Sequence, residues 1–114
     1  MNGVRPDSRT PTYVALKLLI DNWRWQGVPF SLRAGKCLSG RHTEISIHFR
    51  TIPLCLFGHE QVCSRLAPNV LKIRIQPDEG IALEFAAKRP GPSVRLSTVS
   101  MDFAYKTYFR MAPN

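Results

Sequence analysis

Large apolar residues recur at every second position in three segments of the chain, EISIHFR (44–50), VLKIRIQ (70–76) and IALEFAAK (81–88). A period of two residues is typical of a β-strand that buries one face, because successive side chains of a strand point to opposite sides. The three segments are therefore predicted to be strands of one amphipathic sheet. Its apolar face would be formed by Ile45, Ile47, Phe49, Leu71, Ile73, Ile75, Ile81, Leu83 and Phe85.

Three further segments also favour strands. TYVALKLLI (12–20) is rich in β-branched and aromatic residues, although Thr10 before Pro11 would also suit the start of a helix. FSLRAGK (30–36) predicts a second short strand, and STVSMDFAYK (97–106) a last one. The apolar side chains that alternate in the first and last of these are Val14, Leu16, Leu18 and Ile20, and Val99, Met101, Phe103 and Tyr105.

The connections between these segments are mostly short. PDEG (77–80) is short enough for a hairpin turn, and DNWRWQGVP (21–29) contains a turn from Gly27 to Pro29. TIPLCLFGHEQVCSRLAP (51–68) is irregular and predicts a short helix or a flexible loop. Strands joined by short turns imply antiparallel pairing.

The predicted fold is α+β and mainly β, a largely antiparallel open sheet of about six strands with little helix. Residues 1–11 would form a polar N-terminal arm, residues 12–109 the sheet domain and residues 110–114 a truncated tail. An amphipathic sheet must cover its apolar face with another layer. Either the strands close into a sandwich, or the covering layer belongs to another domain or subunit and the chain is a fragment.

The net positive charge favours an anionic partner but does not identify it. The 114 residues carry a net charge of +8, and eleven of the sixteen basic residues are arginine, whose forked guanidinium suits phosphate. Nucleic acid, acidic lipid and a phosphorylated small molecule all remain open, as does a basic surface that only keeps the protein soluble.

The cysteines do not predict a disulfide framework or a metal site. Cys37, Cys55 and Cys63 are odd in number and widely spaced, and His59 between the last two lacks a fourth ligand at a usual zinc spacing. Three reduced thiols in a cytoplasmic protein are expected.

The N-terminus has no apolar signal-peptide core, and no apolar run approaches the ~20 residues of a membrane helix, so no membrane partner is expected.

The sequence contains no catalytic motif of the nucleophile-elbow, dinucleotide-fingerprint, P-loop or zinc-protease type. His48 is expected on a solvated strand face, and Glu84 and Asp102 are expected to form surface salt bridges. Gly35 before Lys36 would allow unusual backbone dihedrals or a close approach to a ligand, and a lysine there can meet a phosphate as a point charge. The basic and polar residues that gather near turns or on one strand face are Arg33, Lys36, Arg41, Lys72, Arg74 and Gln76.

Four blocks of the chain resemble the C-terminal domain of the glucose-6-phosphate dehydrogenase family. They are YVALKLLIDNWRWQGVPFSLRAGK (13–36), TEISIHF (43–49), IRIQPDEGIALEFAAKRPG (73–91) and MDFAY (101–105), in the family's order and at about its spacing. The resemblance implies a mainly antiparallel sheet beside a Rossmann-type coenzyme domain. It also implies an enzyme that oxidises glucose 6-phosphate to 6-phosphoglucono-lactone and passes hydride to NADP, with the substrate between the two domains.

The resemblance also implies roles for individual residues. Lys36 falls at a substrate-binding lysine, Arg41 at a second basic substrate contact, and Gln76 at a glutamine that contacts the sugar phosphate. Arg33 and Arg74 fall at two basic positions of a structural NADP found in some members. His42 and Ser46 stand where that second site would have a lysine and an arginine, and Cys37, Ser31 and Ala34 also depart from the commonest residues. Trp23 and Trp25 are expected to pack.

Several family blocks are missing from the 114 residues, namely the glycine-rich coenzyme fingerprint, the RIDHYLGK block with the catalytic histidine, and a C-terminal helical segment. The chain is therefore expected to hold no catalytic residue, to be inactive alone, and to contribute substrate contacts and a homo-oligomer interface. The alternatives are a self-association module without chemistry and a basic β-domain that binds nucleic acid. The second has only charge in its favour, because no RNA-binding signature is present, so no nucleic acid partner is expected.

Overall fold

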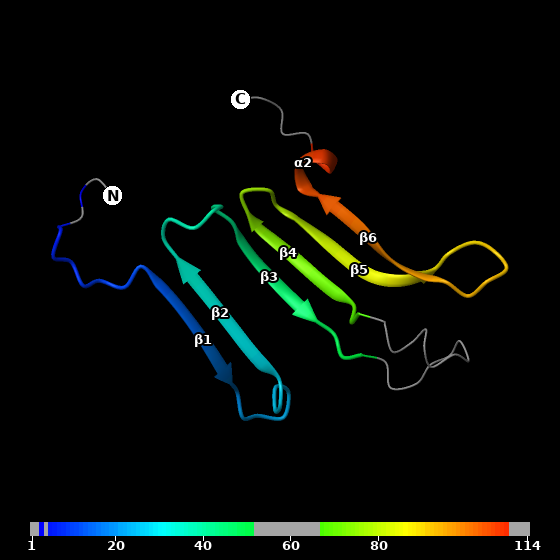
Figure 1. The fold of residues 1–114 in the computed structure, drawn as a ribbon, viewed down its shortest axis with the longest axis horizontal. Coiled ribbons are helices and arrows are strands. Elements are labelled where there is room, and N and C mark those ends of the chain that lie inside the picture. Colours follow the sequence, from blue (N-terminus) through cyan, green and yellow to red (C-terminus); the bar gives the residue numbers. More distant parts are fainter. Residues whose placement is uncertain (1–2, 4, 52–66, 110–114) are drawn as a thin grey trace. The chain divides into compact units, whose positions relative to one another are not determined.

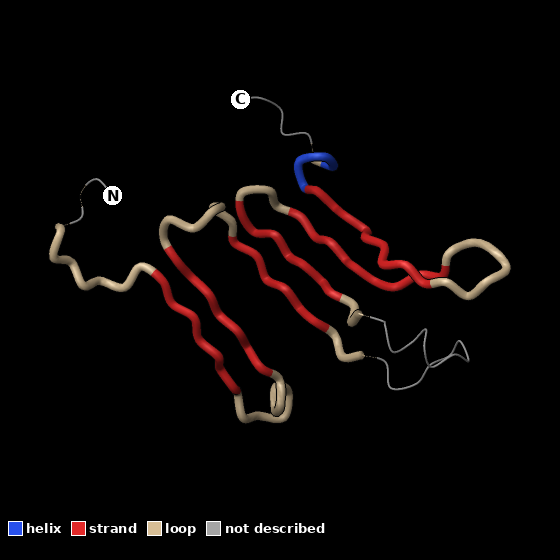
Figure 2. Tube along the Cα trace, in the orientation of Figure 1, coloured by secondary structure: helices blue, strands red, loops and turns tan. Residues whose placement is uncertain are grey.

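The chain divides into two compact units, residues 1–40 and residues 41–114, in a computed structural model that describes residues 3, 5–51 and 67–109. Strands dominate both units (Figures 1 and 2), and the described part of the chain contains one short helix, α2 (Tyr105–Tyr108). The mainly β prediction is confirmed. The irregular segment predicted over residues 51–68 falls mostly on residues 52–66, which lie outside the described residues.

The first unit is an antiparallel hairpin of β1 (Tyr13–Leu19) and β2 (Pro29–Gly35). The strand prediction for residues 12–20 is therefore confirmed over the helical alternative. Cross-strand partners share a face, so the alternation predicted from the sequence produces one apolar side. That side consists of the pairs Val14 with Ala34, Leu16 with Leu32, and Leu18 with Phe30.

The connector between β1 and β2 is a compact turn organised by Asn22. Its side-chain Oδ1 accepts hydrogen bonds from the backbone N–H groups of Arg24 (3.1 Å) and Trp25 (2.9 Å), a turn that asparagine favours. The Trp25 ring meets Phe30 edge to face, with ring centroids 5.2 Å apart. Packing is therefore confirmed for Trp25. It is wrong for Trp23, whose side chain is fully exposed.

The second unit is a four-stranded antiparallel meander in the order β3 (Thr43–His48), β4 (Val70–Gln76), β5 (Gly80–Lys88) and β6 (Leu96–Ala104). All six predicted strands are thus present, but their hydrogen bonds divide them into sheets of two and four strands. Two predicted ends differ. β3 ends before Phe49, and Tyr105, predicted to continue the last strand, begins α2.

The two faces of the four-stranded sheet differ in chemistry. Ile45, Ile73, Ile81 and Phe103 lie opposite one another across the four strands, and Ile47, Leu71, Leu83 and Met101 form the next row. This apolar face is open, because Ile81 is 46% and Met101 63% exposed. The two buried apolar residues of the described chain, Val70 and Ala82, belong to the polar face. Within this unit the structure therefore favours an open sheet over a closed sandwich.

Candidate functional site

Lys36 directly follows β2 at the open end of the hairpin. Its backbone N–H donates to the carbonyl oxygen of Thr12 at 2.8 Å, so the ladder continues one residue beyond the strand. The Lys36 side chain is exposed. The hairpin therefore fixes the lysine's backbone and leaves its ammonium free to meet a ligand.

Two side chains crowd the space beside Gly35. A Cβ at this position would lie 2.9 Å from Cδ2 of Tyr13 and 3.2 Å from Cδ1 of Leu38. The positive φ near the lysine, 56°, belongs to Cys37. The expectation of unusual dihedrals at Gly35 is therefore wrong, because Cys37 is the residue with the left-handed backbone. A close approach of Gly35 to a ligand stays a prediction.

Arg33 lies on the second face of the hairpin. It pairs with Ala15 across the strands, and the neighbouring pair on that face is Lys17 with Ser31. All these side chains are exposed. The described hairpin thus carries its cations Lys17 and Arg33 on one face and its aliphatic pairs on the other.

Arg41 and Gln76 come to the same end of the four-stranded sheet. Gln76 is the last residue of β4 and pairs with Thr43, the first residue of β3, which follows Arg41 by two residues. Figure 1 shows the start of β3, the β4–β5 turn and α2 at this end. The sheet unit therefore brings together Arg41 and Gln76, whereas Lys36 and Arg33 belong to the hairpin unit.

Arg74 forms a forked ion pair across the polar face of the sheet. Its Nη1 and Nη2 donate to the carboxylate of Asp102 at 2.7 and 2.8 Å, and Nη2 also lies 3.4 Å from the carbonyl oxygen of Phe103. The hydrogen bond from Arg74 lowers the pKa of Asp102, and the same bond raises the pKa of Arg74. A bidentate, charge-assisted pair is the strongest kind of side-chain contact on this face.

The fork can form because β5 has no side chain beneath it. Arg74 is on β4 and Asp102 on β6, so the guanidinium passes over Gly80 of β5. A Cβ on Gly80 would lie 2.5 Å from Nη2 of Arg74 and would also clash with the carbonyl oxygen of Phe103. Gly80 thus leaves the space that the guanidinium occupies, and the backbone oxygen of Phe103 is the stricter limit on a side chain at this position.

Lys72 and Glu84 form a second pair on this face, with Nζ and Oε1 2.6 Å apart. The hydrogen bond to Glu84 raises the pKa of Lys72. The predicted salt bridges of Glu84 and Asp102 are both confirmed, and the polar face largely neutralises its own charge. His48, expected to be solvated, is exposed and contacts the Ser46 hydroxyl at 3.4 Å.

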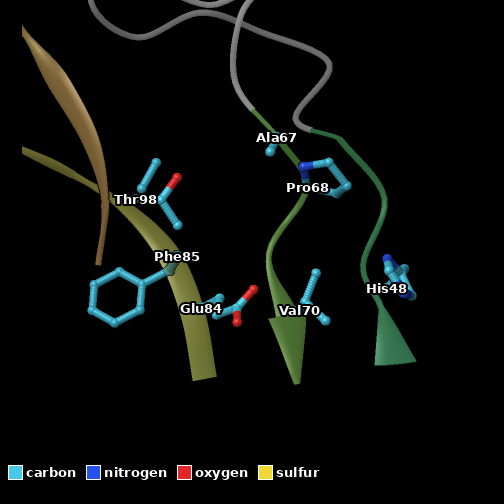
Figure 3. A pocket seen from close by; sticks show the side chains of 8 residues that line it. His48, Ala67, Pro68, Val70, Glu84, Phe85 and Thr98 are labelled. Carbon is cyan, nitrogen blue, oxygen red and sulfur yellow. The ribbon is translucent and has the colours of Figure 1, made fainter. Parts of the chain in front are cut away.

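An open hollow of about 270 Å³ lies on the polar face at the other end of the sheet (Figure 3). Residues of β3, β4, β5 and β6 all contribute to it, so sequence patterns within single segments missed it. Its lining is mainly apolar, and its acid, Glu84, is already bound to Lys72. The lining residues are His48, Ala67, Pro68, Val70, Glu84, Phe85, Ala86 and Thr98.

The described residues hold neither a metal-binding cluster nor a membrane-spanning helix. No group of three or more histidine, cysteine, aspartate or glutamate side chains gathers there in a way that could hold a metal ion. Among the same residues, no helix has the length and apolar character needed to cross a membrane.

Comparison with known proteins identifies a family over the whole chain. Residues 1–114 match the family described as "Glucose-6-phosphate dehydrogenase, C-terminal domain". A glucose-6-phosphate 1-dehydrogenase of Treponema pallidum is 52% identical over 105 residues, which cover 91% of this chain and 20% of that protein. One from Bacillus subtilis is 46% identical over 103 residues, again 20% of its length. The chain thus spans about a fifth of the length of these relatives.

Solved structures agree with the sequence comparison. A structure described as glucose-6-phosphate dehydrogenase in complex with its substrate glucose 6-phosphate superimposes with a TM-score of 0.82, at 36% identity, over 97% of this chain and 22% of the other. A glucose-6-phosphate 1-dehydrogenase from Mycobacterium avium gives a TM-score of 0.73 at 40% identity, over 91% of this chain and 22% of the other.

Proposed function

Because the chain belongs to the family of glucose-6-phosphate dehydrogenase C-terminal domains, we propose that it is the substrate-contacting part of such an enzyme. The reaction is oxidation of glucose 6-phosphate to 6-phosphoglucono-lactone with reduction of NADP. The observation that carries the proposal is the match over all 114 residues, supported by a substrate-bound structural neighbour that covers 97% of the chain.

Within that enzyme, Lys36, Arg41 and Gln76 are proposed to hold the sugar phosphate. Lys36 offers an exposed ammonium on a backbone fixed by Thr12, and Arg41 offers a guanidinium that can bind phosphate in a forked manner. Gln76 offers a neutral amide donor at the end of β4. Two cations and one directional donor would bind the phosphate and orient the sugar, which is the condition for a productive reaction geometry.

NADP accepts the hydride in this reaction, and the coenzyme is proposed to bind mainly to parts of the enzyme outside these residues. The base that removes the hydroxyl proton is proposed to lie outside them too, because it must reach the substrate hydroxyl within hydrogen-bond distance.

The described residues fit a second, structural NADP poorly. Both Nη atoms of Arg74 already bind Asp102, and a phosphate would have to compete with that carboxylate.

The proposal also covers assembly and location. The open apolar face of the four-stranded sheet supports a homo-oligomer or a covering domain, since exposed patches of this kind mark interaction sites. A cytoplasmic location suits the free, exposed thiol of Cys37, because thiols stay reduced there.

A chimera tests the proposal. Residues 1–114 would replace the matching fifth of the Bacillus subtilis relative, and reduction of NADP would be followed by absorbance with glucose 6-phosphate as substrate. We expect the chimera to be active and the 114-residue chain alone to stay at the level of a protein-free blank. A chimera that folds, binds NADP and shows no activity would contradict the proposal, as would activity of the chain alone.

A further inference from the structure

The end of β4 and the β4–β5 turn, residues 74–80, are tied to the C-terminal end of the sheet unit by three contacts, here called the turn clamp. The first is the fork from Arg74 to Asp102. The second is the Tyr105 N–H, which donates to the carbonyl oxygen of Glu79 at 3.0 Å. The third is the ion pair of Lys106 with Asp78, also 3.0 Å.

The C-terminal side of the clamp is itself anchored. α2 follows β6 directly, and the rings of Phe103 and Tyr108 pack with centroids 4.8 Å apart.

The three contacts of the turn clamp differ in strength. The Lys106 and Asp78 side chains are 69% and 79% exposed, which leaves their attraction largely screened. The Arg74 and Asp102 side chains are 30% and 48% exposed and make two parallel bonds, so the fork dominates the clamp.

The clamp acts where the proposed substrate residue stands. Gln76 is two residues after Arg74 on β4, and side chains two residues apart on a strand share a face. Its amide is neutral, so its contact with a phosphate depends on direction and distance more than the contact of a lysine does. A displacement of about 1 Å at such a position is costly for substrate binding.

We propose that Asp102 is a positioning residue for the substrate site: it holds Arg74, and through Arg74 the end of β4, so that Gln76 is presented to the sugar phosphate. The inference rests on the proposed function. Asp102 does not touch the substrate in this scheme. Its effect passes through the turn clamp, which distinguishes it from Lys36 and Arg41.

A matched control lies on the same face. Glu84 also pairs with a cation of β4, Lys72, and its replacement by glutamine also removes one negative charge. Lys72 is four residues from Gln76, and neither Lys72 nor Glu84 takes part in the clamp. Asp102→Asn and Glu84→Gln therefore cause the same change of charge, and only the first releases the turn.

The experiment uses the chimeric enzyme described above, with and without Gln76→Ala. We expect Asp102→Asn to raise KM for glucose 6-phosphate about five- to tenfold, with kcat and KM for NADP within about twofold, and Glu84→Gln to change all three less than twofold. In the Gln76→Ala background Asp102→Asn should change KM less than twofold, because the residue it positions is gone. Amide hydrogen exchange of residues 76–80 should be faster in Asp102→Asn than in Glu84→Gln.

The outcomes separate the inference from the proposed function. A well-folded parent chimera without activity overturns both. An active parent in which Asp102→Asn leaves KM unchanged, or in which Glu84→Gln raises it equally, overturns the inference alone. If Asp102→Asn raises KM for glucose 6-phosphate equally in the parent and in the Gln76→Ala background, the inference is also overturned, because Asp102 would then act independently of Gln76. If amide hydrogen exchange of residues 76–80 is unchanged in Asp102→Asn, the contacts do not hold the turn and the inference is wrong. This measurement decides the question even if reduced stability of the variant obscures its kinetics.

Discussion

Lys36 is presented by backbone that is constrained on both sides. Before it, Gly35 lies close against the side chains of Tyr13 and Leu38. After it, Cys37 holds a φ of 56°, which few non-glycine residues adopt. The lysine's own N–H is bound to Thr12. A flexible side chain on such a fixed base loses less freedom on binding than one on a mobile loop.

We expect Lys36→Ala in the chimeric enzyme to raise KM for glucose 6-phosphate about ten- to hundredfold. The change removes one charge-assisted contact, worth roughly 1.5–3 kcal/mol. KM for NADP should stay nearly constant. Arg41→Ala should act in the same direction but more weakly, because Arg41 precedes β3 and is less fixed by its neighbours, and Gln76→Ala should cost least because it removes a neutral partner.

Lys17→Ala is the control, because Lys17 is an exposed lysine of the same hairpin. It should leave both constants unchanged. Steady-state kinetics with each substrate varied in turn would measure these effects. If Lys36→Ala behaves like Lys17→Ala, then Lys36 is only a surface charge.

At the scale of elements, the glycine at position 80 of β5 affects the packing of both neighbouring strands. It belongs to β5, yet the space above it is used by Arg74 of β4, and its own Cα faces the Phe103 carbonyl of β6. A side chain there would press against a backbone oxygen, which cannot rotate away as a flexible side chain can.

Gly80→Ala should therefore lower the stability of the chimera by roughly 1–3 kcal/mol, the usual cost of forcing an extra methyl into a filled site. Thermal or denaturant unfolding would measure the change. Ser100→Ala, on the exposed part of the neighbouring strand, should leave stability within about 0.5 kcal/mol. A Gly80→Ala protein as stable as its parent would show that β6 moves aside at little cost.

Strand existence could be predicted from the sequence, because alternation is a local signal. Residues 44–50 and 70–76 alternate in sequence, and the structure has β3 and β4 there. Partner choice is not local. Nothing in the alternation says that β2 ends one sheet and β3 starts another, or that Lys72 meets Glu84 rather than Glu44. Those facts depend on register, which only the paired strands define.

The candidate site, too, could be predicted from the sequence only in part. The roles of Lys36, Arg41 and Gln76 came from resemblance, and their local settings came from the structure. The left-handed backbone at Cys37 has no sequence signal, because cysteine rarely adopts it. The start of α2 at Tyr105 was missed because the apolar alternation of β6 runs on past the point where the chain turns. Both features arise from contacts between segments.

At the scale of the whole molecule, the sheet unit has an apolar face that its own described residues leave open. Ile45, Ile47, Ile81 and Met101 are between 41% and 63% exposed. The curated relatives are about five times longer than this chain, which spans 20% of two of them. The simplest reading is that the rest of such an enzyme, or a second copy, covers this face.

The isolated 114-residue chain should accordingly bind a hydrophobic fluorescent dye and form oligomers, whereas the complete chimera should bind little dye. Ile45→Lys should reduce both effects, because it places a charge on the open face. Ser46→Lys, one residue along and on the opposite face, should leave them unchanged. Light scattering and dye titration would measure this. A monodisperse monomer with a sharp melt and no dye binding would contradict the open sheet.

The fork over Gly80 also constrains how this segment can change over evolutionary time. Arg74, Gly80 and Asp102 lie on three different strands, far apart in sequence, yet they meet at one place on the sheet. A side chain at position 80 would crowd the guanidinium and would also meet the carbonyl oxygen of Phe103, so the backbone of β6 favours glycine there even without the fork. A family member with a larger residue at position 80 should therefore show a shifted β6 backbone near position 103 and a displaced arginine side chain.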